Sequence, residues 1–307
     1  MAQSAPTYDK ALYERILLRT LRSFSALCKR EGLRYFLSFG SAIGAVRHGG
    51  MIPWDDDIDV CMPREDYERF LSLGEWCTVR LDGKDERFRI VSLRTSPERS
   101  DVPFSYAKWT DTTSTIWEQR RYRCTFGVFV DVFPLERVSS VQEAQTLCEE
   151  YRRSLLQYKR SFRSHSLSDW KEAILGARFH DLGAWTMDVC ALRGRRDKYR
   201  REFIALDESL SGRGNDGEYC TVLDTPYSMK KVTCPIQWFS DTVKMPFGDV
   251  EAPLPVGYDS ILSQIYGDYM TPPPEEGRIS AHHHYFVDLQ NCLTPQQVEG
   301  KLKGRQK

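Results

Sequence analysis

Four acidic residues, Asp55, Asp56, Asp57 and Asp59, fall within five positions. They run into the apolar segment 58–62, which reads as a short buried strand. Because side chains alternate along a strand, Asp57 and Asp59 would point to the same face, with Cα atoms about 6–7 Å apart at a rise of ~3.3 Å per residue. Asp55 shares this parity if the strand begins early, whereas Asp56 points the other way. Both carboxylates can then reach one divalent cation, or one each of two neighbouring cations.

An exposed acidic turn is the alternative interpretation of this run. The metal site is favoured because the acidic residues open a buried strand, where like charges repel each other without a counterion. Carboxylate oxygens suit Mg²⁺ and Mn²⁺ equally, so the sequence predicts one of these ions without choosing between them.

A second element with chemical potential lies upstream of the acidic run. We expect a strand at 35–39, a break at Gly40 and Ser41, and a helical turn from Ala42 to Arg47 with Ser41 as its N-cap. Glycine lets the backbone approach a ligand, and free N–H groups at a helix start attract anions. Gly40 and Ser41 are therefore candidates to bind phosphate, and Arg47 could add a charge-assisted contact.

The surrounding pattern predicts an α+β fold with a mixed sheet flanked by helices. Residues 8–31 form an amphipathic helical pattern that ends at Gly32, and a second helix is expected at 64–73. Further strands are expected at 88–93, 104–109 and 127–133, followed by a mainly helical stretch from about 140 to 210. Late strands at 242–247 and 250–252, around Gly248-Asp249, are expected to form a hairpin and to complete the sheet, with a short helix at 258–266 after them.

At the level of motifs, the chain resembles the LicD family, which includes fukutin and fukutin-related protein, within the polymerase-β-like nucleotidyltransferase superfamily. The main motif is Gly40-Ser-Ala-Ile-Gly-Ala-Val-Arg-His-Gly-Gly-Met-Ile-Pro-Trp-Asp-Asp-Asp-Ile-Asp59. Further matches are Met62-Pro-Arg-Glu-Asp-Tyr67, Tyr106-Ala-Lys108, the stretch 127–135 that contains Asp131, and Tyr266-Gly-Asp-Tyr-Met270. The resemblance implies one catalytic domain over 1–307, with a core at about 8–139 and 224–290 and a helical insertion at about 140–223.

The resemblance also implies an activity: transfer of a phosphorylated alcohol from a CDP-activated donor onto a sugar hydroxyl. CDP-choline is the expected donor, and the expected acceptor is a cell-surface glycan or a lipid-linked saccharide. Asp57 and Asp59 would hold the metal with Asp55 nearby, and Asp131 would complete the site or accept a proton. Lys108 would neutralise phosphate, and Arg278 and His282 would contact the donor phosphate or nucleotide.

A quaternary ammonium group prefers an aromatic cage, because cations are attracted to ring faces. Trp54, Trp109, Trp117 and Tyr122 are candidates for such a cage, although aromatic residues at these positions are more often part of a core. Three consecutive histidines, 282–284, cannot all face one ion on a regular backbone, so we expect no tri-histidine site.

Charge and cysteine content exclude several classes of protein. Lys plus Arg and Asp plus Glu are balanced at 43 each, which gives no support for a nucleic-acid partner. The nine cysteines include no Cys-x-x-Cys pair, and residues 1–9 do not read as a signal peptide, so we expect a reducing, cytoplasmic location. Six basic residues between Arg193 and Arg201 read as a solvated helix face, or as a peripheral contact with the inner membrane surface.

Two other functions remain open from the sequence. A nucleotidyltransferase that moves NMP from an NTP to a small acceptor would use the same metal site but attack a different phosphorus. The other is a scaffold that binds metal or nucleotide without catalysis; loss of Asp57, Asp59 or Asp131 would have supported it, and all three are present.

Overall fold

The computed structural model describes residues 8–96, 101–162, 190, 194–213, 216–278 and 284–304. The chain divides into two compact units. The first comprises Met1–Ala144 with Asn215–Lys307, and the second comprises Gln145–Gly214. The second unit falls inside the predicted insertion, and its described part is helical, with most of α4 (Val141–Arg160) and all of α7 (Arg196–Ser211).

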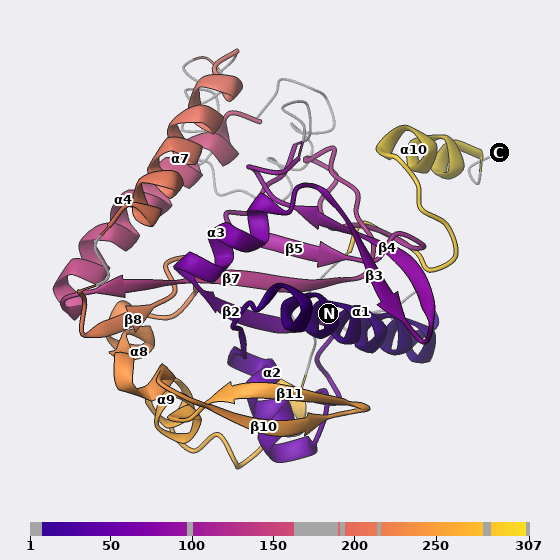
Figure 1. Ribbon diagram of the computed structural model, residues 1–307. Coiled ribbons are helices and arrows are strands. Elements are labelled where there is room, and N and C mark those ends of the chain that lie inside the picture. The colour runs from indigo at the N-terminus through magenta and orange to yellow at the C-terminus, as the bar shows by residue number, and fades with distance from the viewer. Residues whose placement is uncertain are drawn as a thin grey trace. The chain divides into compact units, whose positions relative to one another are not determined.

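The first unit is built on a mixed sheet, which confirms the predicted α+β fold (Figure 1). Its strands follow the order β1-β2-β7-β5-β4-β3, and β7 also pairs with β8, which pairs with β9. Their bounds are β1 Phe36–Leu37, β2 Asp59–Pro63, β3 Trp76–Leu81, β4 Lys84–Val91, β5 Ala107–Thr110, β7 Phe129–Val138, β8 Tyr219–Thr221 and β9 Cys234–Pro235. The pair β2–β7 is parallel, whereas β1–β2 and β5–β7 are antiparallel.

Helix α1 (Lys10–Glu31) packs on this sheet through a stripe that includes Leu17, Leu21 and Phe24, each fully buried. Asp9 caps its first turn, and Gly32 ends it in the left-handed conformation (φ 63°) that glycine adopts without a steric penalty. The helix also holds the acidic loop that precedes β2. Lys10 Nζ donates to Pro53 O at 2.7 Å, and the Tyr13 hydroxyl donates to Asp56 O at 3.0 Å.

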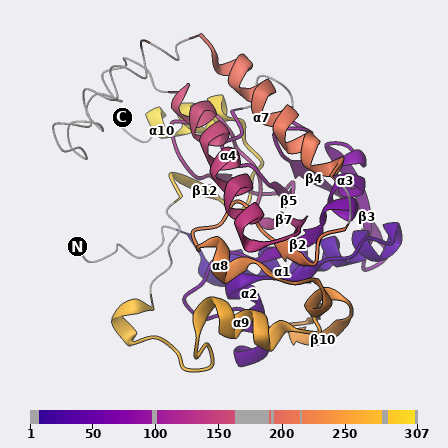
Figure 2. The ribbon, with the colours of Figure 1, turned by 90° about the vertical axis from the view of Figure 1, so that its left-hand side faces the viewer.

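Several further elements of the first unit lie near strands β1, β2 and β7 or the helices next to them. Helix α3 (Arg64–Ser72) follows β2, and the hairpin β10–β11 (Thr242–Phe247, Val250–Pro255) contacts α1 and β1. Helix α9 (Tyr258–Tyr266) packs against α2 (Phe39–Ile43) and α8 (Met229–Val232), as Figures 1 and 2 show. Short 3₁₀ helices lie at Ile236–Phe239 and Glu275–Gly277.

Residues 284–304, near the C-terminus, contact a segment from earlier in the sequence. Strand β12 (Phe286–Asp288) pairs with β6 (Thr115–Trp117), and α10 (Pro295–Gly304) follows it. Trp117, Phe286 and Val298 form a small apolar cluster between these elements. None of β6, β12 or α10 was expected from the sequence.

Two local predictions were wrong. The helix after β1 begins at Phe39, not at Ala42, its N-cap is Ser38, not Ser41, and it continues as a π-helix over Gly44–His48. The hairpin β10–β11 forms a two-stranded sheet of its own and does not complete the main sheet, which gains β8 and β9 instead.

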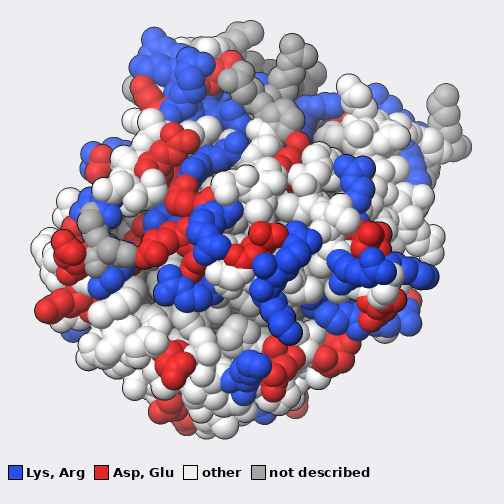
Figure 3. Space-filling model, in the orientation of Figure 1, with Lys and Arg blue, Asp and Glu red and all other residues white. Residues whose placement is uncertain are grey.

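Lysine and arginine side chains are interspersed with aspartate and glutamate over the face shown in Figure 3. This mixture agrees with the balanced charge of the sequence. No helix in the described parts of the chain is long and apolar enough to cross a membrane.

Candidate active site

Three carboxylates meet where β2 and β7 lie side by side. Asp59 is the first residue of β2, and its direct partner in the parallel register is Asp131 of β7. Asp57 comes from the loop before β2, not from the strand itself. Ligand oxygens of Asp57, Asp59 and Asp131 all lie within 4.8 Å of one another, and those of Asp55, Asp56 and Asp57 form a second such group. The structure therefore brings together the carboxylates that the sequence singled out, and adds Asp56.

The environment of Asp59 is strongly unfavourable for an isolated negative charge. Burial raises the pKa of its carboxyl well above the usual range, and the carboxylates of Asp57, Asp131 and Asp55 raise this pKa further. Lys108 opposes the shift. A divalent cation would relieve the repulsion, and an all-oxygen donor set suits Mg²⁺ or Mn²⁺. These residues therefore fit the metal that the sequence predicted.

Lys108 on β5 lies next to this cluster, but not in the position predicted for a phosphate ligand. Its side chain is 1% exposed, and the ammonium donates to Asp131 Oδ1 at 2.7 Å and lies 3.2 Å from Glu118 Oε1. Burial alone would lower the pKa of Lys108, but Asp131 and Glu118 outweigh it and raise this pKa. The ammonium thus meets carboxylates inside the protein, and Lys108 is not among the residues that line the cleft described next.

The carboxylates lie in a cleft of ≈ 610 Å³, a size typical of small-molecule sites. Asp55, Asp57, Asp59 and Asp131 all line it, together with Gly40. A Cβ added to Gly40 would come within 2.7 Å of Asp55 Oδ2, so glycine is needed here for the carboxylate to lie against the backbone of α2.

Ser41 has a different role from the one predicted. It is buried, it does not line the cleft, and its Oγ accepts a hydrogen bond from Asp59 N at 2.9 Å. This hydrogen bond joins α2 to the first residue of β2, so Ser41 helps to position Asp59. The hydroxyl does not face the space where a phosphate group could bind.

Two basic side chains lie near Trp54, and one of them, Arg47, lines the cleft whereas Arg278 does not. The Arg47 guanidinium donates to Tyr269 O at 2.6 Å and lies 5.9 Å from the Trp54 ring centroid. Arg278 lies 5.3 Å from the same ring, and its Nε donates to Pro273 O at 2.9 Å. Burial lowers the pKa of Arg47, and the nearby charge of Arg278 lowers it further. Two of the predicted phosphate-binding cations thus share one place, whereas His282 lies outside the described residues.

The predicted four-residue aromatic cage does not form. Trp54 lines the cleft. Trp109, on β5, is fully buried and its ring contacts those of Phe24, Phe70 and Phe88. Trp117 and Tyr122 are buried together, with Trp117 Nε1 donating to Tyr122 O at 2.6 Å, and neither lines the cleft. Their side chains serve the core, as the simpler interpretation of the sequence held.

Other aromatic residues form a wall of the cleft that the sequence analysis missed. They are Phe39, Tyr106, Phe133, Tyr227 and Tyr266. Ring centroids are 4.3 Å apart for Tyr106 and Phe133, and 5.4 Å apart for Tyr227 and Tyr266. Asp224 lines the same cleft and accepts a hydrogen bond from Ser105. The sequence indicated this aromatic wall only in part. Tyr106 and Tyr266 belong to the motifs quoted above, whereas no motif or pattern pointed to Asp224 or Tyr227.

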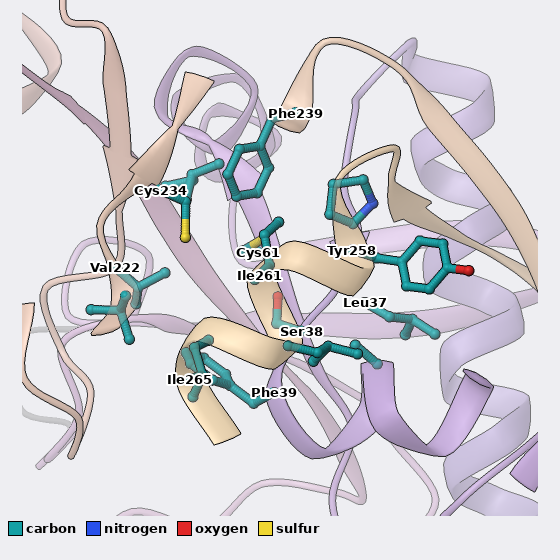
Figure 4. Close-up of a pocket in the computed structure, with 15 residues that line it drawn as sticks. Leu37, Ser38, Phe39, Cys61, Val222, Cys234, Phe239, Tyr258, Ile261 and Ile265 are labelled. Carbon is teal, nitrogen blue, oxygen red and sulfur yellow. The ribbon is translucent and has the colours of Figure 1, made fainter. Parts of the chain in front are cut away.

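Phe39 lines the cleft and also a second, apolar pocket of ≈ 50 Å³. Figure 4 shows this second pocket. The pocket is bounded by Leu37, Cys61, Cys234, Ile261 and other apolar residues of β1, β2, β9 and α9. Phe39 has φ 48°, which is uncommon for a residue with a side chain and places strain at the start of α2. The apolar pocket therefore packs against the segment that carries Gly40 and Ser41.

The comparisons with known proteins agree with this geometry. The family model for the LicD/FKTN/FKRP nucleotidyltransferase domain matches residues 32–163, which include β2, β5 and β7. Residues 32–163 are therefore similar to the nucleotidyltransferase domain of the LicD family. A relative from Haemophilus influenzae, lipopolysaccharide cholinephosphotransferase LicD, is 28% identical over 278 residues, or 87% of this chain and 93% of the relative. Ribitol 5-phosphate transferase FKRP from human and mouse is 44% identical over 52 residues, which are 17% of this chain and 10% of each relative.

Proposed function

We propose that the chain transfers a phosphorylated alcohol from a CDP-activated donor onto a sugar hydroxyl of a glycan or its precursor, with Mg²⁺ or Mn²⁺ as cofactor. The observation that carries this proposal is the meeting of Asp57, Asp59 and Asp131 within 4.8 Å of one another in a cleft of ≈ 610 Å³. The names of the LicD and FKRP relatives support phospho-alcohol transfer as the reaction.

The three carboxylates are the residues that would hold the cation, with Asp55 beside them. When bound, the cation neutralises charge on the phosphate oxygens, which is the main catalytic need of phosphoryl transfer. The chain itself supplies position. Ser41 fixes the backbone at Asp59, and Gly40 lets Asp55 lie against α2. Arg47 and Arg278 would contact the anionic part of the donor near Trp54.

The reaction forms a bond between the acceptor oxygen and the phosphorus that carries the alcohol. The bond from that phosphorus to the oxygen of CMP breaks, and the acceptor proton passes to a base in the cleft or to solvent. CMP leaves with the electron pair of the broken bond. The rival nucleotidyltransferase reaction would attack the α-phosphorus of a triphosphate and release pyrophosphate.

The aromatic wall supports a cationic alcohol such as choline as the group transferred. Ring faces attract a quaternary ammonium, and the carboxylate of Asp224 adds a negative charge in the same cleft. A neutral polyol such as ribitol would gain nothing from this attraction and would need hydrogen bonds instead. We therefore place CDP-choline ahead of CDP-ribitol as the donor.

A thermal-shift panel with CDP-choline, CDP-ribitol, CDP-glycerol, CTP, ATP and UDP-glucose tests the proposal, each with Mg²⁺ and with EDTA. A ligand that binds only the folded state at a hundredfold excess over its Kd adds about 2.7 kcal/mol of stability. We expect a Mg²⁺-dependent shift with CDP-choline that is lost in Asp57→Ala/Asp59→Ala. A shift with triphosphates alone would favour the nucleotidyltransferase, and no shift with any nucleotide would favour a scaffold.

A further inference from the structure

Three charged residues in register cross the sheet, and two of them, Asp59 and Asp131, line the cleft. Lys108 of β5 is the direct antiparallel partner of Asp131 on β7, and Asp131 is the direct parallel partner of Asp59 on β2. The ammonium of Lys108 donates to Asp131 Oδ1 at 2.7 Å. Because Lys108 does not line the cleft, this contact reaches Asp131 from within the protein.

The ammonium is held in place on its other sides. Glu118 Oε1 lies 3.2 Å from Nζ, and the Phe129 ring centroid lies 3.5 Å from it. Three more rings, those of Phe104, Tyr106 and Phe126, have centroids 5.0–5.4 Å away. The backbone of Glu118 is held by its carbonyl, which accepts from Tyr285 N at 3.1 Å next to β12. The Lys108 ammonium thus lies between two carboxylates and close to four aromatic rings.

We propose that Lys108 is a positioning residue that orients the Asp131 carboxylate for the divalent cation, with Glu118 as its anchor. The inference rests on the proposed function in one respect, namely that a cation binds to Asp57, Asp59 and Asp131. Partners that hydrogen-bond to a metal-binding carboxylate set its direction, and losing one typically costs 10–100-fold in metal affinity or activity.

A purely structural role explains these contacts less well. Apolar residues of similar volume can often replace a whole buried ion pair without loss of stability, although removing one partner alone is destabilising, so the pair is weak evidence for a purely structural role. A direct role in phosphate binding would need the ammonium to reach the cleft, and it is 1% exposed. The remaining role for Lys108 is to orient the carboxylate of Asp131, to which its ammonium donates.

Manganese titration followed by electron paramagnetic resonance, which measures free Mn²⁺, tests the proposal. The variant Lys108→Met keeps the length of the side chain and removes its charge and its hydrogen bonds. If Lys108→Met acted only through the lost positive charge, the site would become more negative and would bind the cation more tightly. If it acts through the lost orientation of Asp131, the cation binds more weakly. We expect Mn²⁺ binding 10–100-fold weaker, with kcat for the CDP-alcohol reduced and the KM for that donor changed less than threefold.

The matched control is Lys244→Met, which removes an exposed lysine that lies 3.2 Å from Glu251, and it should change neither quantity. Equal or tighter Mn²⁺ binding by folded Lys108→Met would overturn the proposal. If Lys108→Met does not fold, Glu118→Asp, which keeps the charge but shortens the anchor, decides: weaker Mn²⁺ binding supports the anchor, and unchanged binding and kcat overturn it. Absence of Mn²⁺ binding by the wild-type protein would instead refute the proposed function.

Discussion

Replacing Asp59 with asparagine should make the metal-free protein more stable while it destroys metal-dependent function. The ligand oxygens of Asp57, Asp59 and Asp131 lie within 4.8 Å of one another. Two full charges 4.8 Å apart repel each other by about 3.5 kcal/mol at an effective dielectric constant of ~20. The Lys108 ammonium and proton uptake by Asp59 reduce this repulsion, so we expect Asp59→Asn to add about 1–3 kcal/mol to the free energy of unfolding in EDTA.

Urea denaturation in EDTA and in saturating Mn²⁺ measures this effect. Mn²⁺ at a hundredfold excess over its Kd should stabilise the wild-type protein by about 2.7 kcal/mol and leave Asp59→Asn nearly unchanged, so the stability difference between the two proteins shifts by about 2.7 kcal/mol towards the wild type. Asp85→Asn, at an exposed acid that pairs with Arg80, is the control and should stay within about 0.5 kcal/mol in both conditions. The reasoning fails if Asp59→Asn is less stable than wild type in EDTA, or if both proteins respond equally to Mn²⁺.

Three further predictions address other parts of the site and the fold. Gly40→Ala should lower kcat about tenfold without loss of stability, because the added Cβ displaces the Asp55 carboxylate while alanine favours the helix; unchanged kcat would contradict this. Tyr227→Leu should raise the KM for CDP-choline about 5–30-fold through lost cation–π attraction, with Tyr227→Phe near wild type as control, and equal effects on CDP-ribitol would count against a cationic donor. Burial alone would raise the pKa of Glu68, but bonds to Arg94 outweigh it and hold this pKa below 4.5. Glu68→Gln should therefore cost about 1 kcal/mol in urea melts at pH 7 and progressively less as the pH falls below 4.5, and a cost independent of pH would exclude the ion pair as its source.

The sequence predicted the elements whose patterns are local. The apolar stripe and terminal glycine of α1, the turn at Gly248-Asp249 and the acidic entry to β2 all depend on neighbours in the chain, and all are present. The pairing of Asp59 with Asp131 joins residues far apart in the sequence, and only the family motifs indicated it. Lone aromatic residues gave no such indication, because a buried tryptophan such as Trp109 and a cleft tryptophan such as Trp54 look alike in sequence.

Two differences from the sequence-based expectation are local. The N-cap position of α2 is Ser38 and not Ser41, and Phe39 after it has a positive φ (48°) that no local preference would predict. Lys108 was expected at the phosphate, but Asp131 and Glu118 draw its ammonium into the interior. For Lys108, a tertiary contact overrides the local pattern.

The central claim is that the carboxylate cluster transfers a phospho-alcohol in a metal-dependent reaction. The most direct test is ³¹P nuclear magnetic resonance of the protein with CDP-choline, a lipopolysaccharide acceptor and Mg²⁺. We predict that CMP appears together with a new phosphodiester signal on the glycan, and that EDTA or Asp59→Asn abolishes both signals. Turnover of CDP-choline in EDTA, or pyrophosphate release from a triphosphate with CDP-choline left intact, would contradict the account.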